Sequence, residues 1–421
     1  MSGGTKSVFQ IEEFKPLAGL YERRKRLYGN YWKYYKAEVY KPSGMGGSEL
    51  GQYTQQRIAN ATRPLFTPLA RAVNLDVALI PGGWAIVPAA SELQGAVEAL
   101  FEASAWEVEG DIYTRFTVAM GEAGLLVVDD REQNQVSLQV LRPDRYVVER
   151  MGRYDARPKR LVFIEMEHGG DELATVIDPD LIRTYRNGEP EGFEGRPPAY
   201  VNGLGFVPFA AAVDDPGDGE GEPTFDDVIA SLDEVNQQAT HLSNIIRKHV
   251  EPQWAAIGAE AGDLTKSGDT VWFFPEGSDI KAVLAEVDFD GFLAFIKEIK
   301  EEVKEGLPEL AFAKLAGLER IASATIELQM AEAVCKIRRL RKPVDYGLRQ
   351  AMRLAGRAAA AMGLHELAVL DSPVLKLDVG RPVISIDALT RLQIDQATTS
   401  KELQSLALER ERALLSGDEN G

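Results

Sequence analysis

Hydrophobic residues in the first 120 positions recur mostly in steps of three and four, which is the spacing of amphipathic helices. This pattern predicts helices over residues 16–40 and 91–120. It also runs through residues 54–75, where Pro64 and Pro68 predict either two short helices or one helix with a kink. The chain is therefore expected to begin with a mainly helical region.

The pattern changes to alternation and β-branched runs from residue 124 onward. Turn residues separate these runs, which predicts a small, mainly antiparallel sheet. Its strands are expected at residues 125–129, 136–141, 146–150, 161–167, 173–177 and 181–186. Two further strands and a turn are predicted at residues 77–88, and residues 187–208, which contain Pro and Gly, are expected to form a loop.

The acidic segment at residues 214–227 (DDPGDGEGEPTFDD) is the strongest break in the pattern, and we expect an exposed linker there. A long helix is predicted directly after it and up to Pro252, with the apolar residues of positions 225–246 on one seam. At ~1.5 Å per residue this helix would reach roughly 35 Å. Pro252 is expected to end it.

A small β insert is predicted at residues 251–286, followed by a second amphipathic helix at 289–303. Strands of the insert are expected at residues 253–257, 270–274 and 280–284. Two helices on either side of such an insert would hold it like a head on a stalk. Their apolar seams are expected to pack against further copies of the chain.

The last third of the chain is predicted to be mainly helical. A short segment at residues 309–322 leads into a long helix at 323–362, with an interruption and a kink expected at Pro343. A strand-like stretch at 374–386 and a polar helix at 387–415 follow. This order of elements predicts an α+β fold with an elongated helical middle.

Composition limits the partners of the chain. The formal net charge is −18, which argues against a conventional nucleic-acid binder, because such proteins gain affinity from cationic groups. The single cysteine, Cys335, is expected to be a buried structural thiol. The apolar runs are too short for a membrane helix, so no membrane association is expected.

The sequence does not match the motifs for nucleotide binding, nucleophilic catalysis or metal binding. The stretch Gly44-Met45-Gly46-Gly47 lacks the lysine of a phosphate loop. The acidic segment does not match a calcium loop, because its third position is Pro216. One cysteine and four scattered histidines do not predict a zinc site. We therefore expect no enzyme activity, no catalytic residues, no metal and no cofactor.

Basic residues gather along the predicted 323–362 helix. They are Lys336, Arg338, Arg339, Arg341, Lys342, Arg349, Arg353 and Arg357. Either they contact DNA or they pair with carboxylates of neighbouring subunits, and we favour the second interpretation. The aromatic residues Trp254, Trp272, Phe273 and Phe274 of the β insert are candidates for a partner interface, although a small hydrophobic core is the favoured interpretation.

The order of several motifs resembles the portal proteins of long-tailed bacteriophages, and the resemblance covers most of the chain. The segments that carry it are residues 27–40 (LYGNYWKYYKAEVY), 60–88, 120–130 (MGEAGLLVVDD), 141–146 (LRPDRY), 205–209 (GFVPF) and 228–236 (VIASLDEVN). Two segments depart from the family pattern: residues 322–326 (ASATI), and Glu222-Pro223-Thr224 after the acidic segment.

The resemblance implies a portal-like division of the chain into wing, stem, clip, tunnel loop and crown. The wing corresponds to residues 1–222 and 323–386, the stem helices to 223–250 and 287–308, the clip to 251–286, the tunnel loop to 309–322 and the crown to 387–421. It also implies a homo-oligomeric ring of about twelve copies at the capsid vertex, through which double-stranded DNA is packaged and ejected.

The resemblance further implies partners and a location. The terminase large subunit, the head-completion adaptor and the major capsid protein are the expected partners, and the virion, with the host cytoplasm during assembly, is the expected location. Candidate contacts to DNA in the tunnel are Lys297, Lys300, Lys304, Lys314, Glu319 and Arg320. The lysines of the second stem helix would give weak phosphate contacts within an acidic wall.

Two other functions stay open from the sequence. The chain is alternatively another phage structural or adaptor protein, which the absence of a ring would favour. A hydrolase that uses paired carboxylates is the less favoured alternative, because such an enzyme needs two carboxylates roughly 5–10 Å apart in a cleft.

Overall fold

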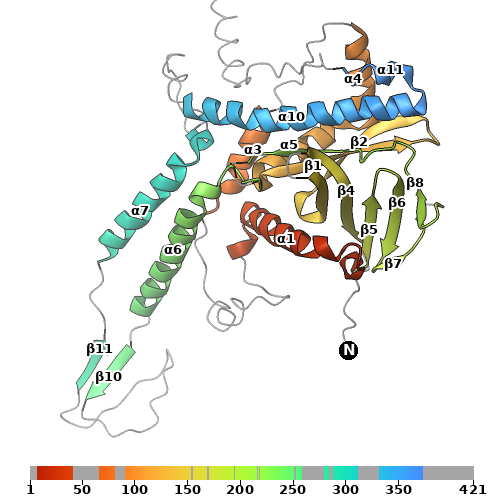
Figure 1. Cartoon of the computed structure of the whole chain (residues 1–421). Coiled ribbons are helices and arrows are strands. Elements are labelled where there is room, and N and C mark those ends of the chain that lie inside the picture. Colours follow the sequence, from red (N-terminus) through yellow and green to blue (C-terminus); the bar gives the residue numbers. More distant parts are fainter. Residues whose placement is uncertain are drawn as a thin grey trace, which may run out of the picture. The chain divides into compact units, whose positions relative to one another are not determined.

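The computed structural model shows an α+β protein (Figure 1). The structure describes residues 7–40, 66–80, 91–152, 155–167, 170–193, 195–215, 217, 219–250, 253–257, 279–283, 288–311 and 331–372. These residues belong to two compact units, the first within residues 1–36, 69–226 and 308–421 and the second within 37–68 and 227–307. The predicted fold class is confirmed.

Helices of the first unit come from both ends of the chain. They are α1 (Lys15–Tyr35), α3 (Leu69–Leu79), α4 (Ser91–Ala103), α5 (Trp106–Met120), α10 (Ala331–Met362) and α11 (His365–Ala368), with the 3-10 turns η1 (Val8–Gln10), η3 (Pro143–Arg145) and η5 (Pro308–Ala311). The strands are β1 (Glu122–Asp130), β2 (Gln135–Leu141), β3 (Tyr146–Gly152), β4 (Asp155–Met166), β5 (Glu172–Ile177), β6 (Leu181–Arg186), β7 (Glu189–Pro190), β8 (Ala199–Val201) and β9 (Phe209–Val213).

These strands form two antiparallel sheets, so the prediction of a single sheet is wrong. One sheet has the order β2-β1-β9, and the other has the order β3-β4-β5-β6-β7 with β8 paired to β6. The division falls at η3, where Pro143 lacks a backbone N–H and the Arg145 N–H donates to the Arg142 carbonyl at 3.0 Å. This turn directs β3 to pair with β4 instead of β2.

Both faces of the larger sheet are covered, because its apolar residues alternate between them. Val147 and Val162 point to one face and meet the N-terminal segment, whereas Tyr146 and Leu161 point to the other face and meet Phe209 of the smaller sheet. Strands with both faces buried carry the near-continuous β-branched sequence from which they were predicted.

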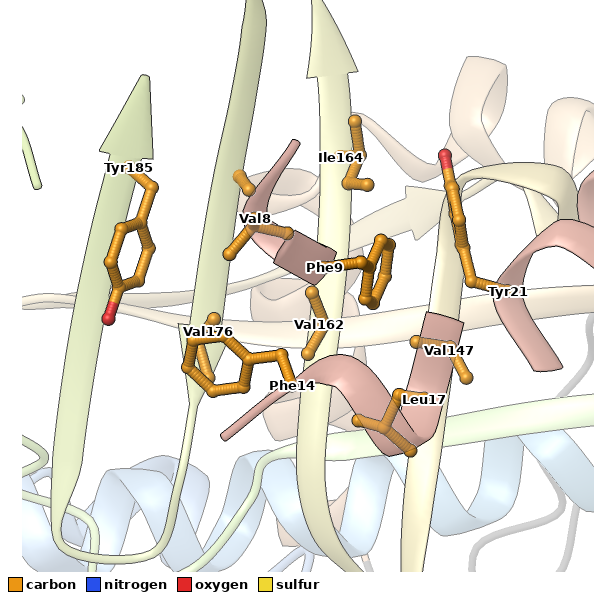
Figure 2. Packing of buried hydrophobic residues seen from close by; sticks show 11 residues of the cluster. Val8, Phe9, Phe14, Leu17, Tyr21, Val147, Val162, Ile164, Val176 and Tyr185 are labelled. Atoms are coloured by element: carbon orange, nitrogen blue, oxygen red, sulfur yellow. The ribbon is translucent and has the colours of Figure 1, made fainter. Parts of the chain in front are cut away.

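The N-terminal segment closes the outer face of the larger sheet. Phe9, Phe14 and Leu17 lie over β3, β4 and β5 (Figure 2), and the Phe9 and Tyr21 rings stack with centroids 4.6 Å apart. Side chains of this size gain roughly 1.5–3 kcal/mol each on full burial. The residues before α1 are therefore part of the core.

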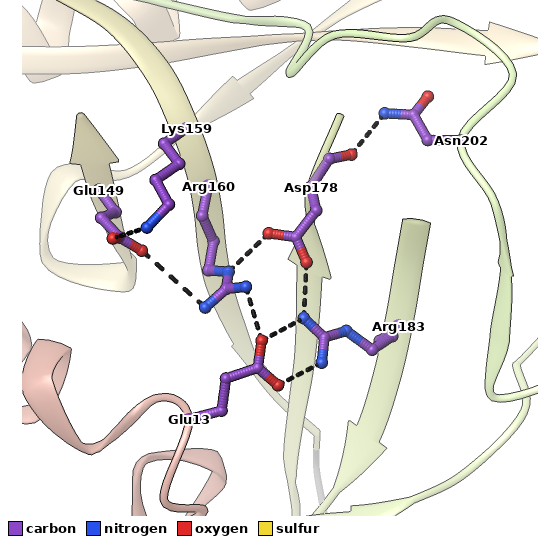
Figure 3. Close-up of polar contacts among 7 residues, drawn as sticks. All are labelled: Glu13, Glu149, Lys159, Arg160, Asp178, Arg183 and Asn202. Atoms are coloured by element: carbon purple, nitrogen blue, oxygen red, sulfur yellow. Dashed lines mark hydrogen bonds and ion pairs between the residues drawn. The ribbon is translucent and has the colours of Figure 1, made fainter. Parts of the chain in front are cut away.

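A carboxylate on this segment ties it to β4, β6 and the turn that follows β5 in the same sheet. Glu13 accepts hydrogen bonds from Arg160 at 2.6 Å and from Arg183 at 2.6 and 3.0 Å, and both arginines also donate to Asp178 (Figure 3). The two guanidinium groups lie 5.2 and 5.0 Å from the centre of the Phe14 ring. Arg183, and with it Arg160, lowers the pKa of the Glu13 carboxyl, so Glu13 stays ionised further into the acidic range.

A buried ion pair joins α1 to both sheets. Arg24 donates to the two carboxylate oxygens of Glu122 at 2.8 and 3.2 Å, and the hydroxyls of Tyr28 and Tyr146 donate to the same carboxylate at 2.6 Å each. Burial opposes ionisation of Glu122, but Arg24 and the two tyrosines outweigh it and hold the pKa of Glu122 below its ordinary value. Glu122 is thus a buried charge with its hydrogen bonds satisfied.

The acidic segment packs beside this ion pair instead of forming the exposed linker that the sequence predicted. A Cβ on Gly121, whose φ is +83°, would lie 2.3 Å from the backbone nitrogen of Glu222. The Gly221 N–H donates to the Tyr28 hydroxyl at 3.2 Å, and the Thr224 N–H donates to the Val118 carbonyl at 3.0 Å. Among the described residues of the segment, Asp215, Gly217, Gly219 and Asp227 are exposed, as the prediction required.

Three predictions of element type or break fail in the first unit. Residues 77–79 belong to α3 and not to a strand, because Leu69, Val73 and Val77 continue one buried helical face. The helix predicted at 91–120 is broken into α4 and α5 at Ala105, which has a φ of +48°. The predicted loop at 187–208 contains the short strands β7 and β8.

The helix α10 continues through Pro343, so the predicted interruption there is wrong. Buried residues on both sides of the proline, among them Leu340 and Leu348, hold the helix in the first unit. Gly347 permits a close approach, because a Cβ there would lie 2.5 Å from the Tyr113 hydroxyl oxygen. Packing thus outweighs the lost backbone hydrogen bond.

Cys335 is exposed on α10, so the prediction of a buried thiol is also wrong. The helical spacing places it on the face opposite the buried residues Ile337 and Leu340. The strand predicted at 270–274 and the segments predicted at 374–386 and 387–415 lie outside the described residues.

The second unit is a helical hairpin, as the sequence predicted. It contains η2 (Glu38–Tyr40), η4 (Asp226–Val228), which begins one residue before it, α6 (Ile229–Val250), β10 (Gln253–Ile257), β11 (Asp279–Val283) and α7 (Phe289–Glu305). The helices run antiparallel, because Gly306 after α7 meets Val228 before α6. Figure 1 shows α6 and α7 side by side, with the antiparallel pair β10–β11 at one end.

The Glu122 ion pair provides a test of this fold. We expect Glu122→Gln to lower the free energy of unfolding by about 3–5 kcal/mol, because it leaves the Arg24 charge buried without a counter-charge. Urea denaturation followed by circular dichroism measures this loss. Glu12→Gln is the matched control: Glu12 pairs with Lys15 on the surface, and its loss should cost under about 1 kcal/mol. A loss for Glu122→Gln as small as that of the control would contradict the account.

Candidate functional site

The hairpin of the second unit holds three of the lysines that the sequence singled out for DNA contact, Lys297, Lys300 and Lys304. Asp288 caps α7 by accepting a hydrogen bond from the Gly291 N–H at 2.9 Å. Ile296, Ile299 and Val303 form the buried seam of the helix. The remaining surface is acidic, with exposed carboxylates at Asp290, Glu298, Glu302 and Glu305.

The three lysines of α7 do not have equal freedom. Lys304 donates to Glu301 at 2.6 Å, and the ammonium of Lys300 lies 5.3 Å from the centre of the Phe66 ring. Lys297 is exposed and makes no ion pair with any residue that the structure describes. Lys297 is therefore the exposed cation of α7 within the acidic surface, whereas Lys300 lies against an aromatic ring and Lys304 pairs with a carboxylate.

The same hairpin also exposes large apolar side chains. Leu293 and Phe295 on α7 are 54% and 46% exposed, and Ile246 on α6 is 46% exposed. A pair of helices has one mutual interface, so apolar residues outside that seam stay in water. The hairpin thus carries apolar surface for which a single copy provides no cover among its described residues.

The other candidate residues are not placed by the structure. Lys314, Glu319 and Arg320 of the predicted tunnel loop lie outside the described residues, as do Trp272, Phe273 and Phe274 of the predicted clip. The backbone of Trp254 lies in β10, opposite Ala282 of β11, and its side chain is not described.

A buried charge cluster that the sequence did not predict lies in the first unit. Lys336 of α10 donates to both carboxylate oxygens of Glu309 in η5 at 2.9 Å and lies 3.8 Å from the Asp76 carboxylate of α3. Both carboxyl side chains are fully buried. Two carboxylates therefore share one lysine. The three residues come from three elements: Asp76 from α3, Glu309 from η5 and Lys336 from α10.

This cluster has two carboxylates and one lysine in a buried site, where low polarity disfavours the extra negative charge. Burial raises the pKa of Asp76 to about 7, with Lys336 lowering it and Glu309 raising it further. Thr224 donates to one Asp76 oxygen at 3.5 Å, and the other oxygen has no hydrogen-bond partner among the described residues. A carboxyl within an apolar helical stretch (LDVALI) is the sequence signal that identifies Asp76.

The basic residues predicted on the long helix have several roles. Arg341 is buried and donates to the Leu79 carbonyl at 2.9 Å. Arg339 lies 3.5 Å from Asp214, and Arg357 lies 3.1 Å from Asp371. Carboxylates of the same copy therefore pair with some of these basic residues. Arg338 and Lys342 are exposed.

The described part of the chain offers neither a metal site nor a membrane span. No group of three or more His, Cys, Asp or Glu side chains there is arranged to hold a metal ion. None of the described helices combines the length and the apolar character that crossing a membrane requires.

Comparison with known proteins gives similarity at the level of structure. No family profile matches the sequence, and the search of curated proteins gives no match. The chain is similar to one from the virion of a native gene transfer agent (GTA) particle, with 14% identity, a TM-score of 0.40 and coverage of 88% of this chain and 95% of that one.

Two other similar chains come from necks of such particles. The first is from the neck of an empty GTA particle computed with C6 symmetry, with 14% identity, a TM-score of 0.41 and coverage of 83% of this chain and 88% of that one. The second is from the neck of a native GTA particle computed with C12 symmetry, with 16% identity, a TM-score of 0.34 and coverage of 77% and 83%. TM-scores below 0.5 do not establish a shared function.

The Asp76 cluster generates a prediction about pH. The folded-state pKa of Asp76, about 7, lies above its ordinary value of 3.8, so the folded protein binds the extra proton and loses stability as pH rises from about 4 to about 7. Asp76→Asn removes this loss. We expect the free energy of unfolding of Asp76→Asn, relative to the unmodified protein, to rise by on the order of a few kcal/mol across that range.

Urea titrations at pH 4.5, 6 and 8 measure the effect. Asp180→Asn is the control, because it removes an exposed carboxylate and leaves the buried cluster of Asp76, Glu309 and Lys336 intact. Parallel profiles for Asp76→Asn and the unmodified protein would show that Asp76 does not carry the proton.

Proposed function

We propose that this chain is a portal protein, a structural subunit of a phage-like head–tail assembly that forms a ring around DNA. The observation that carries the proposal is the α6–α7 hairpin, whose exposed Leu293, Phe295 and Ile246 need a partner. Identical hairpins placed side by side around an axis would cover these residues. A heterologous contact of this kind repeats until a ring closes.

The proposed assignments follow the order of the chain. Residues 1–222 and 323–386 form the wing, α6 and α7 form the stem, residues 251–286 form the clip, 309–322 the tunnel loop and 387–421 the crown. In this arrangement, about twelve copies form the ring at the capsid vertex. The clip contacts the head-completion adaptor and the terminase large subunit, and the wing contacts the major capsid protein.

The charges of α7 suit a channel through which DNA slides. Exposed carboxylates repel phosphate, so DNA does not gain the counterion-release affinity that would hold it in place. Lys297, the exposed lysine of this surface, supplies a single weak contact per copy. The force that moves DNA would come from the terminase, and the portal itself would have no catalytic role.

The carboxylate-hydrolase alternative has its best candidate in Asp76 and Glu309. Both side chains are fully buried and share Lys336, so in the part of the chain that the structure describes neither carboxylate is exposed to a substrate. A phage structural or adaptor protein without a ring is the alternative that the following experiment separates from a portal.

We expect the purified protein to form a particle of about twelve chains by sedimentation velocity. The double variant Leu293→Glu/Phe295→Glu should shift the population to monomers, because each side chain contributes roughly 1–3 kcal/mol of burial per contact. Val201→Glu/Met166→Glu is the matched control: these side chains are 77% and 54% exposed in the first unit, and their variant should still assemble. A monomeric unmodified protein, or a Leu293→Glu/Phe295→Glu variant that assembles normally, would contradict the proposal.

A further inference from the structure

The outward face of α10 is a second surface with unusual composition. Arg338, Lys342 and Tyr346 follow one another at steps of four, so they lie on one side of the helix. The opposite side, which includes Leu340, Val344 and Leu348, is fully buried. Tyr346 is 58% exposed, which is high for a large aromatic side chain. We refer to Arg338, Lys342 and Tyr346 as the basic patch.

The basic patch is not neutralised within one copy. Neither Arg338 nor Lys342 forms an ion pair with a residue in the described part of the chain. Their neighbour Arg339 reaches Asp214 at 3.5 Å while remaining 62% exposed, which is a weak pair. This surface is cationic although the whole chain has a net charge of −18.

A surface of opposite charge lies where α4 ends and α5 begins. Glu102 precedes the break at Ala105, and Glu107 and Asp111 follow it one helical turn apart. All three carboxylates are exposed and have no ion-pair partner among the described residues. Val108, between them, is 63% exposed. We refer to Glu102, Glu107, Val108 and Asp111 as the acidic patch.

We propose that the basic patch of one copy binds the acidic patch of the next copy. Each patch has an apolar residue, Tyr346 or Val108, among charges of one sign, and an apolar centre with a polar rim is the usual anatomy of a protein interface. The two patches are different surfaces, so the contact is heterologous and repeats from copy to copy. The inference rests on the proposed ring, for which it supplies a contact in the first unit.

Charge complementarity favours a second copy over DNA as the occupant of the basic patch. A DNA backbone would use the cations but would leave the Tyr346 ring and the acidic patch in water. A second copy covers both patches at once with residues that this chain itself provides. Opposite charges would also select how two copies meet, because contact of two acidic patches or of two basic patches would bring like charges together.

Charge reversal with rescue tests the inference. Arg338→Glu/Lys342→Glu should raise the concentration required for half-assembly about tenfold or more, and Glu102→Lys/Glu107→Lys should do the same. The variant that combines all four substitutions restores opposite charges and should assemble as the unmodified protein does. Sedimentation velocity at 50 and 500 mM salt gives the readout, with circular dichroism to confirm that each variant is folded.

The control reverses the same number of charges elsewhere. Arg26→Glu/Lys33→Glu changes two exposed cations of α1 and should leave assembly unchanged.

If the unmodified protein forms rings and Arg338→Glu/Lys342→Glu forms them equally well, the inference is overturned while the portal proposal stands. Retained rings with weaker binding of a double-stranded DNA fragment would reassign the basic patch to DNA. Failure of the four-substitution variant to recover assembly would also overturn the pairing, provided that it is folded. An unmodified protein that forms no ring would overturn the portal proposal itself.

Discussion

The ion pair between Arg24 and Glu122 is the interaction on which the first unit depends. Arg24 comes from α1, and Glu122 is the first residue of β1, directly after α5. The same guanidinium donates to the carbonyls of Pro143 and Tyr146, at 3.3 and 3.1 Å, where the chain passes from one sheet to the other. One buried cation thereby fixes a helix against the junction of both sheets. Burying this ion pair costs desolvation free energy. The hydrogen bonds that both carboxylate oxygens of Glu122 accept offset that cost.

The second unit has the opposite physical character, because its hairpin is too thin to bury all its apolar residues. The seam between α6 and α7 covers Ile296, Ile299 and Val303, and the exposed Leu293 and Phe295 lie outside it. A chain that retains such surface in an acidic, otherwise polar helix gains from self-association. In the proposed ring, the neighbouring copies supply what a larger core supplies in a compact domain.

Local patterning predicted the elements well and their partners poorly. The strands β1 to β6 and the helices α1, α6 and α7 follow from alternation and three-to-four spacing, because these periods are properties of adjacent residues. Pairing between distant residues has no such signature. Asp76, Glu309 and Lys336 meet from three separate segments, and nothing in the period of any of them indicates this.

The same limit explains the predictions that failed. Turn residues at Pro143 marked a break between strands but not a change of sheet, since that depends on which strand lies nearby. Pro343 was expected to interrupt its helix, yet packing on both sides keeps the helix continuous. Of the proposed site, the acidic surface of α7 and its lysines were predicted from the sequence. The sequence did not show that these lysines differ in exposure. That difference depends on the contacts of Lys300 with Phe66 and of Lys304 with Glu301.

Single-particle imaging of the unmodified protein tests the central claim most directly. The account predicts closed rings of about twelve copies with a central hole, in which neighbouring α6–α7 hairpins cover Leu293 and Phe295. A two-fold dimer, or a monomer with these side chains in water, would contradict it.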